Sequence, residues 1–177
     1  MKDERKTVTL YNMIFPVWIL VWVPYLWIVL IPANYLIDRL VFTISAKKQK
    51  PELTQKFFRK HTWKLCLSGF LSDFIGSILL VMPLFIEPPE SVRKDYNHSA
   101  FGKFMNGLQF NAFSNPGAFL YTLFAIFISG GLIYLIDGAI LKGTKEFTPE
   151  QAKKIAFWMA VITAPYLYLF PASLLYY

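Results

Sequence analysis

Four long apolar stretches occupy most of this 177-residue chain, and they decide the solvent in which it folds. They cover residues 10–44, 63–86, 119–141 and 155–177. The hydrocarbon core of a bilayer is about 30 Å thick, so a helix that rises about 1.5 Å per residue crosses it in about 20 residues. Every stretch reaches that length. The chain is therefore predicted to be an all-α, polytopic integral membrane protein with a bundle of four transmembrane helices.

Charged side chains are concentrated between the apolar stretches rather than within them. Segregation of this kind is typical of membrane proteins. The formal net charge of +7 could indicate a nucleic-acid partner, but the basic residues lie next to the predicted spans. We therefore expect anionic lipid headgroups as their partner, and no nucleic acid. The residues expected at those headgroups are Lys47, Lys48, Lys50, Arg59 and Lys60.

The first stretch is longer than one crossing requires. Its 35 residues would extend about 52 Å as a single helix, and Pro16, Pro24 and Pro32 interrupt it. Each proline removes a backbone donor and tends to kink a helix. Three arrangements remain open: one bent and tilted crossing, a helix that continues into the cytoplasm, or a re-entrant pair of short helices.

Basic residues also predict the orientation of the chain. The connections at residues 45–62 and 142–154, with the neighbouring Lys64, hold 11 of the 18 Lys and Arg residues. The positive-inside rule then places both connections in the cytoplasm and both termini outside. The basic residues near the N-terminus, Lys2, Arg5 and Lys6, argue in the other direction. Because the sequence shows no large extracytoplasmic domain and no sorting signal, we expect a bacterial cytoplasmic membrane.

The long middle connection, residues 87–118, is expected to be extracytoplasmic and to contain a short helix. Apolar residues recur in it at helical spacing among polar ones, which predicts an amphipathic helix in the headgroup layer. The whole chain is thus expected to be one membrane domain of two tandem helical hairpins with an interfacial helix between them. The apolar residues of that pattern are Phe101, Phe104, Met105, Leu108 and Phe113.

A weak internal repeat relates the two halves. The tetrapeptide Tyr-Leu-Ile-Asp ends at Asp38 and again at Asp137. A basic linker with a Pro-Glu pair follows each copy, and each linker enters an apolar stretch. The implied unit is a helical hairpin used twice in the same orientation. A chance match remains an equal alternative, because Leu, Ile and Tyr are abundant here.

Four charged residues within or at the edge of the spans form the candidate site: Asp38, Arg39, Asp73 and Asp137. Charges inside a span are costly and usually face the protein interior. Asp73 shares a helical face with small residues that permit close helix approach; they are Cys66, Gly69, Gly76 and Ser77. We expect the four groups to form one cluster, with Arg39 paired to Asp73 or Asp137. The excess negative charge would then require a proton, water or a bound cation.

Two interpretations of this cluster remain open. It can be a proton or cation site of the kind that transporters use, or a polar clasp that fixes helix register; the clasp is the more common case. Other chemistries have no support in the sequence. The pattern contains no nucleophile with its base, no phosphate-binding glycine loop and no clustered His or Cys. We therefore expect no enzymatic activity, no cofactor and no metal.

Small size and short connections favour a non-enzymatic accessory or interaction subunit of a membrane complex. The alternative is a small oligomeric transporter or channel with a proton or cation site around Asp73. This second function requires self-association, because four helices are few for a transporter that acts as a monomer. A membrane-protein partner or a second copy of the chain is expected in either case.

Overall fold

The computed structural model describes residues 16–175, and every regular element in that range is a helix. Residues 10–15 of the first apolar stretch and 176–177 of the fourth lie outside it. The all-α class is confirmed for the described chain. The α-helices are α1 (Trp27–Gln49), α2 (Gln55–Val81), α3 (Glu90–Arg93), α4 (Ala100–Phe110), α5 (Pro116–Gly143) and α6 (Pro149–Thr163). The 3₁₀ helices are η1 (Val17–Trp22), η2 (Pro24–Leu26), η3 (Met82–Phe85), η4 (Ala112–Ser114), η5 (Tyr166–Leu169) and η6 (Ala172–Leu175).

Three helical segments of the described chain are long and apolar enough to cross a membrane: Pro24–Gln49, Gln55–Phe85 and Pro116–Gly143. They support the prediction of a helical membrane protein. The fourth apolar stretch behaves differently. Its helix, α6, has 15 residues and ends at Thr163, which is shorter than one bilayer crossing.

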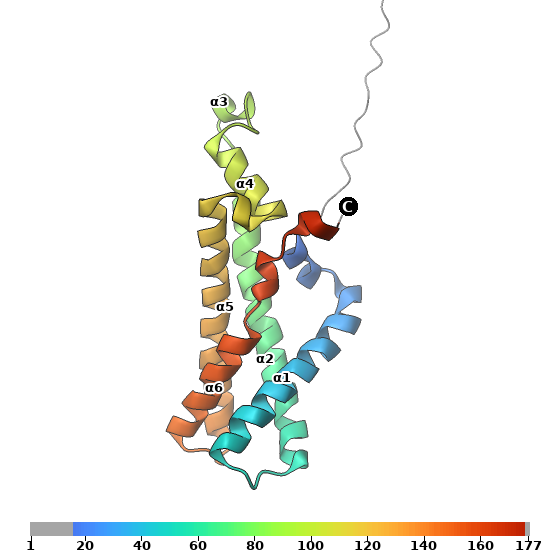
Figure 1. Cartoon of the computed structure of the whole chain (residues 1–177), viewed down its shortest axis with the longest axis vertical. Helices are drawn as coiled ribbons and strands as arrows, with labels where there is room; N and C mark the ends of the chain where they lie inside the picture. Colours follow the sequence, from blue (N-terminus) through green and yellow to red (C-terminus); the bar gives the residue numbers. More distant parts are fainter. Residues whose placement is uncertain (1–15, 176–177) are drawn as a thin grey trace, which may run out of the picture.

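The long helices pack in a closed ring, in which α1 contacts α2, α2 contacts α5, α5 contacts α6, and α6 returns to α1. Figure 1 shows α2 and α5 running side by side along the molecule, with α1 crossing obliquely. The α1–α2 and α5–α6 linkers lie at one end. α3, α4 and both described ends of the chain lie at the other. The two basic linkers therefore share one end of the bundle, as the predicted orientation requires.

Polar caps explain where the helices begin. Thr54 accepts a hydrogen bond from the amide of Phe57 at the start of α2, and Thr148 forms a capping box with Gln151 at the start of α6. Both helices thus begin well before the apolar stretches at residues 63 and 155. The bounds of an apolar stretch therefore do not locate the start of a helix whose first turns are polar or basic.

Prolines break the chain at two places. Val23 is extended before Pro24, so the described part of the first apolar stretch begins with η1 and η2 and becomes α-helical only at Trp27. Pro32 lies inside α1 and does not end it. Ala164 also leaves the helical conformation before Pro165, with φ −56° and ψ 151°, so α6 ends at Thr163. The first and fourth stretches are therefore interrupted, whereas the second and third are long helices.

Two apolar clusters fill the interior. The cluster near the basic linkers includes Phe42, Phe58 and Ile155, and the cluster at the opposite end includes Trp18 and Leu80. The middle of α2, which carries Asp73, lies between them. At the linker end, Lys50 forms an ion pair of 2.6 Å with Glu146 and so joins the two linkers. The middle connection contains α4, as predicted, with Met105 and Leu108 buried.

Candidate functional site: an acidic cavity beside an interrupted helix

Asp38 lies in the middle of α1 and is 5% exposed. It faces α2 at a glycine: a Cβ added to Gly69 would lie 3.8 Å from Oδ2 of Asp38. The adjacent Cys66 is also buried and donates a long hydrogen bond, 3.8 Å, to the carbonyl of Ile31. The small residues at positions 66 and 69 therefore let α1 approach α2 closely beside the carboxylate.

Asp73 lies farther along α2 and faces the same cavity as Asp38. Its Oδ1 is buried and has no hydrogen-bond partner among the described groups. The hydroxyl of Tyr168, in η5, donates to the backbone carbonyl of Asp73. This hydrogen bond links the segment after α6 to α2 and does not involve the carboxylate of Asp73.

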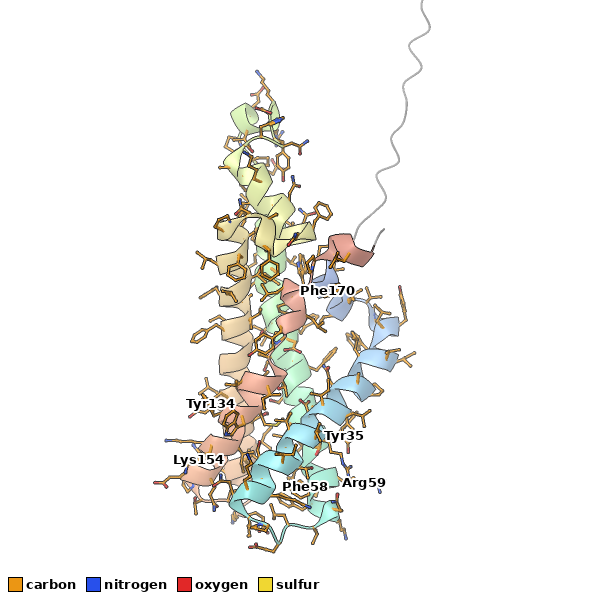
Figure 2. The ribbon with its side chains drawn as sticks, viewed as in Figure 1. Tyr35, Phe58, Arg59, Tyr134, Lys154 and Phe170 are labelled. Carbon is orange, nitrogen blue, oxygen red and sulfur yellow. The ribbon has the colours of Figure 1, made fainter. Side chains whose placement is uncertain are left out.

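The cavity has a volume of about 530 Å³. Its walls come from η1, α1, α2, Phe113 of η4 and the chain between Ile162 and Pro171. It lies beside the chain that follows α6, which ends at Thr163. Figure 2 shows Phe170, one of its lining residues, on the segment that follows α6, near the start of the described chain. Besides Asp38 and Asp73, the polar side chains on its walls are those of Asn34, Thr163, Tyr166 and Tyr168.

Asp137 occupies a different environment from Asp38 and Asp73. It is 0% exposed on α5, and its Oδ1 accepts a hydrogen bond of 2.7 Å from the hydroxyl of Ser68. Its Oδ2 is buried without a partner in the described part of the chain. Asp137 is not a lining residue of the cavity. The predicted cluster is thus divided, with two carboxylates at the cavity and the third in the α2–α5 contact.

Arg39 does not join the carboxylates. Its guanidinium donates to the hydroxyl of Tyr35 and to Oε1 of Gln55, each at 3.3 Å. The expected ion pair with Asp73 or Asp137 is therefore not formed. Consecutive helical residues project about 100° apart. When Asp38 points into the bundle, Arg39 therefore projects from a different face of α1. Arg39 then extends toward the basic end of the bundle, as long cationic side chains commonly do.

A stripe of small residues closes the contact between α2 and α5. Ser68, Ser72 and Gly76 repeat every four residues on α2 and are buried. The hydroxyl of Ser129 on α5 donates to the carbonyl of Ser72 at 3.1 Å. A Cβ on Gly76 would overlap the Ser129 hydroxyl and lie 3.3 Å from the carbonyl oxygen of Ala125. Close approach of this kind is typical of small residues at membrane helix contacts.

The sequence analysis placed Gly76 on the face of Asp73 but missed Ser68, Ser72 and two further residues of the site. Ser68 and Ser72 repeat with Gly76 at a four-residue spacing on α2, which is the signal that could have found them. Tyr168 and Asn34 carry no local signal, because only the break at Pro165 and the tilt of α1 bring them to the cavity.

The charge balance of the cavity limits its chemistry. The ion pairs of the described chain are Lys50–Glu146, Arg93–Glu87 and His98–Asp95, so no basic side chain neutralises Asp38 or Asp73 there. No group of three His, Cys, Asp or Glu among residues 16–175 is arranged to hold a metal ion. Two carboxylates on mostly apolar walls can instead attract a proton or an organic cation.

No family model matches the chain, and no curated protein or solved structure matches it significantly. The function must therefore be argued from the cavity itself.

Proposed function

We propose that this protein binds a hydrophobic organic cation within the membrane and acts as a small transporter or carrier for it. Asp38 and Asp73 would hold the positive charge. The observation that carries this proposal is the pairing of two carboxylates, from α1 and α2, on the walls of one cavity with no basic partner in the described chain. A cation bound there would replace the missing counter-charge.

The size and the walls of the cavity support an organic cation. Its volume of about 530 Å³ lies within the range of small-molecule sites. Leu30, Ile37 and Phe70 supply apolar surface around the acidic groups. A ligand with an apolar body and one positive charge would bury that body and meet a carboxylate. A neutral polar solute would find few hydrogen-bond partners on such walls.

The proposed topology has four crossings in two hairpins. α1, α2 and α5 would cross as helices, and α6 would cross together with the interrupted segment after it. The basic linkers would lie in the cytoplasm, and the described ends of the chain would lie on the other side. The break at Pro165 would then fall within the membrane, where irregular backbone is tolerated if it lines a cavity. Transport would require self-association, because the four crossings of one copy are few for a complete transport pathway.

Equilibrium binding of tetraphenylphosphonium tests the proposal. The purified full-length protein in detergent should bind this hydrophobic cation, and Asp73→Asn should weaken binding by about 30-fold or more, because the variant lacks the charge that the ligand meets in an apolar site. Asp95→Asn is the matched control, since Asp95 is exposed in the middle connection beside His98. Equal binding by wild type and Asp73→Asn would refute the site.

Flux measurements separate binding from transport. Wild-type protein in liposomes should move tetraphenylphosphonium across the bilayer faster than Asp73→Asn protein does. A protein that binds the cation without moving it would be a receptor or storage protein rather than a transporter. A merely structural carboxylate should accept Asn with both binding and flux unchanged.

A non-enzymatic accessory subunit is the second candidate. The observation that favours it is the shortness of both connections at the basic end, since α1 reaches α2, and α5 reaches α6, through a few residues. The described chain thus offers no soluble domain of its own at that end. Gentle extraction of tagged protein from native membranes, followed by mass spectrometry, tests this function. A stoichiometric foreign membrane protein would support it, and a homogeneous homo-oligomer would contradict it.

A further inference from the structure

A second hollow lies at the basic end of the bundle, away from the acidic cavity. It has a volume of about 520 Å³ and separates the first turns of α2 from the α5–α6 linker. Lys56, Lys60 and Lys64 line it along α2, and Gly143 and Thr144 line it from the end of α5. We call it the lysine groove.

The positive charge of the lysine groove is not neutralised by the described chain. Lys56, Lys60 and Lys64 take part in none of its ion pairs. Glu146 also lines the groove, but it lies 2.6 Å from Lys50 and is paired with it. Three ammonium groups therefore face one hollow at successive turns of a single helix, with a spacing of about 6 Å along its axis.

The same face of α2 continues as exposed apolar surface. Leu67, Leu71 and Ile78 follow Lys64 at spacings of three, four and seven residues and are 47%, 52% and 37% exposed. These spacings keep all of them on one side of the helix with the lysines. Trp63, which is 49% exposed, marks the change from basic to apolar surface, as aromatic residues do at membrane interfaces.

We infer that the lysine groove binds the headgroup of an anionic phospholipid whose acyl chain lies along α2. The phosphate would contact Lys60 and Lys64, and the chain would follow Leu67 and Leu71. A soluble phosphate compound would use the lysines but not the apolar part of the stripe, so the continuous surface favours a lipid. This inference involves neither Asp38 nor Asp73, and it stands whether or not the cavity binds a cation.

Native mass spectrometry of the full-length protein tests the inference. Protein mixed with dioleoyl phosphatidylglycerol should retain the lipid, and it should retain dioleoyl phosphatidylcholine much less. Replacing all three groove lysines by Gln should lower the apparent affinity for phosphatidylglycerol by at least about tenfold, since each basic residue near an anionic headgroup contributes about fivefold. These positions are exposed, so the variant should fold like the wild type.

The matched control removes the same charge at the same end of the bundle but outside the groove. It is the triple variant Lys142→Gln, Lys153→Gln and Lys154→Gln, all at exposed positions. Phosphatidylglycerol retention should survive in this control. If both triple variants lost phosphatidylglycerol equally, the inference would be overturned, because general surface charge would then explain the binding. So would equal retention of the two lipids, or full competition by glycerol phosphate, which would identify a site for a soluble phosphate.

Discussion

Asp38 and Asp137 end the same tetrapeptide, yet their surroundings differ. Asp137 is fully buried against α2 and accepts a hydrogen bond from Ser68, whereas Asp38 faces a cavity. Figure 2 places Tyr35 and Tyr134, the first residues of the two copies, at similar heights on opposite sides of the bundle. The tetrapeptide therefore does not decide whether its carboxylate is packed or open. The groups packed beside each copy differ: Ser68 of α2 meets Asp137, whereas Gly69 of α2 and the interrupted chain after α6 lie beside Asp38.

The helices that follow the two copies in the chain, α2 and α6, differ in continuity. α2 continues unbroken past Ser68 to Val81, but α6 stops at Thr163. Counted from the N-caps Thr54 and Thr148, the α6 position that corresponds to Ser68 is Ile162, whose side chain cannot donate a hydrogen bond. We call the surroundings of Asp137 the closed side, because the Ser68 hydroxyl and the small-residue stripe of α2 pack there. We call the surroundings of Asp38 the open side, because Ile162 and the interruption of the helix at Pro165 lie there. Four predictions test this contrast.

The largest effect is expected on the closed side. Gly76→Leu would force a side chain into Ser129 and the backbone of Ala125, so it should destabilise the fold by about 3 kcal/mol or more, or prevent expression. Thermal unfolding followed by size-exclusion chromatography measures this. Gly131→Leu is the control, because a Cβ there meets nothing within 4 Å. Similar behaviour of the two variants would mean that α2 and α5 do not pack as described.

The next effect is the coupling between Ser68 and Asp137. Ser68→Ala should cost about 1–3 kcal/mol, because it leaves a buried carboxylate without its donor. A double-mutant cycle with Asp137→Ala should give a coupling energy of about 1 kcal/mol or more. The same cycle between Ser68→Ala and Asp38→Asn should be nearly additive. Equal coupling to both aspartates would contradict the difference between the two sides.

A smaller effect is expected from repairing the break. Pro165→Ala restores the missing backbone donor and allows α6 to continue, which should narrow the cavity next to Asp38. Binding of tetraphenylphosphonium should then weaken by about tenfold while the protein remains folded. Circular dichroism should report the added helix, and Pro51→Ala in the α1–α2 linker serves as the control. Unchanged binding with increased helicity would show that the break does not form the site.

The smallest effect concerns the ion pair between the two linkers. Glu146 accepts a hydrogen bond from Lys50 and thereby raises the pKa of that amine above its ordinary value of 10.5. A raised pKa means that the contribution is present below the ordinary Lys pKa and is lost as pH rises through the raised value. The contribution is therefore fully present at neutral pH, but the pair is exposed, so Glu146→Gln should lower stability only slightly there, and less still at high salt. A large loss at pH 7 would mean that this pair, rather than helix packing, joins the halves.

The sequence predicted the elements whose signal is local. Long apolar runs located α2 and α5, the periodicity after Phe101 located α4, and the basic connections matched the two linkers at one end of the bundle. It did not predict the ends of α2 and α6, because their first turns are polar and depend on capping by Thr54 and Thr148.

The candidate site was predicted less completely than the fold. Asp38 and Asp73 do meet at one cavity, but Arg39 points elsewhere and Asp137 packs separately. Neighbours in sequence point in different directions from a helix, so Asp38 and Arg39 could not both face the same cluster. The cavity depends on where a proline stops α6 relative to α1, and such a tertiary relation leaves no periodic pattern in the chain.

The central claim is that the open aspartate binds a cation and the closed one does not. Titration calorimetry with tetraphenylphosphonium on Asp38→Asn and Asp137→Asn proteins tests it most directly, since both variants remove one charge from the same tetrapeptide. Both must first elute as folded, monodisperse protein. We predict that Asp38→Asn weakens binding by about 30-fold or more and that Asp137→Asn binds as tightly as the wild type. Equal loss in both, or loss in Asp137→Asn alone, would contradict the account.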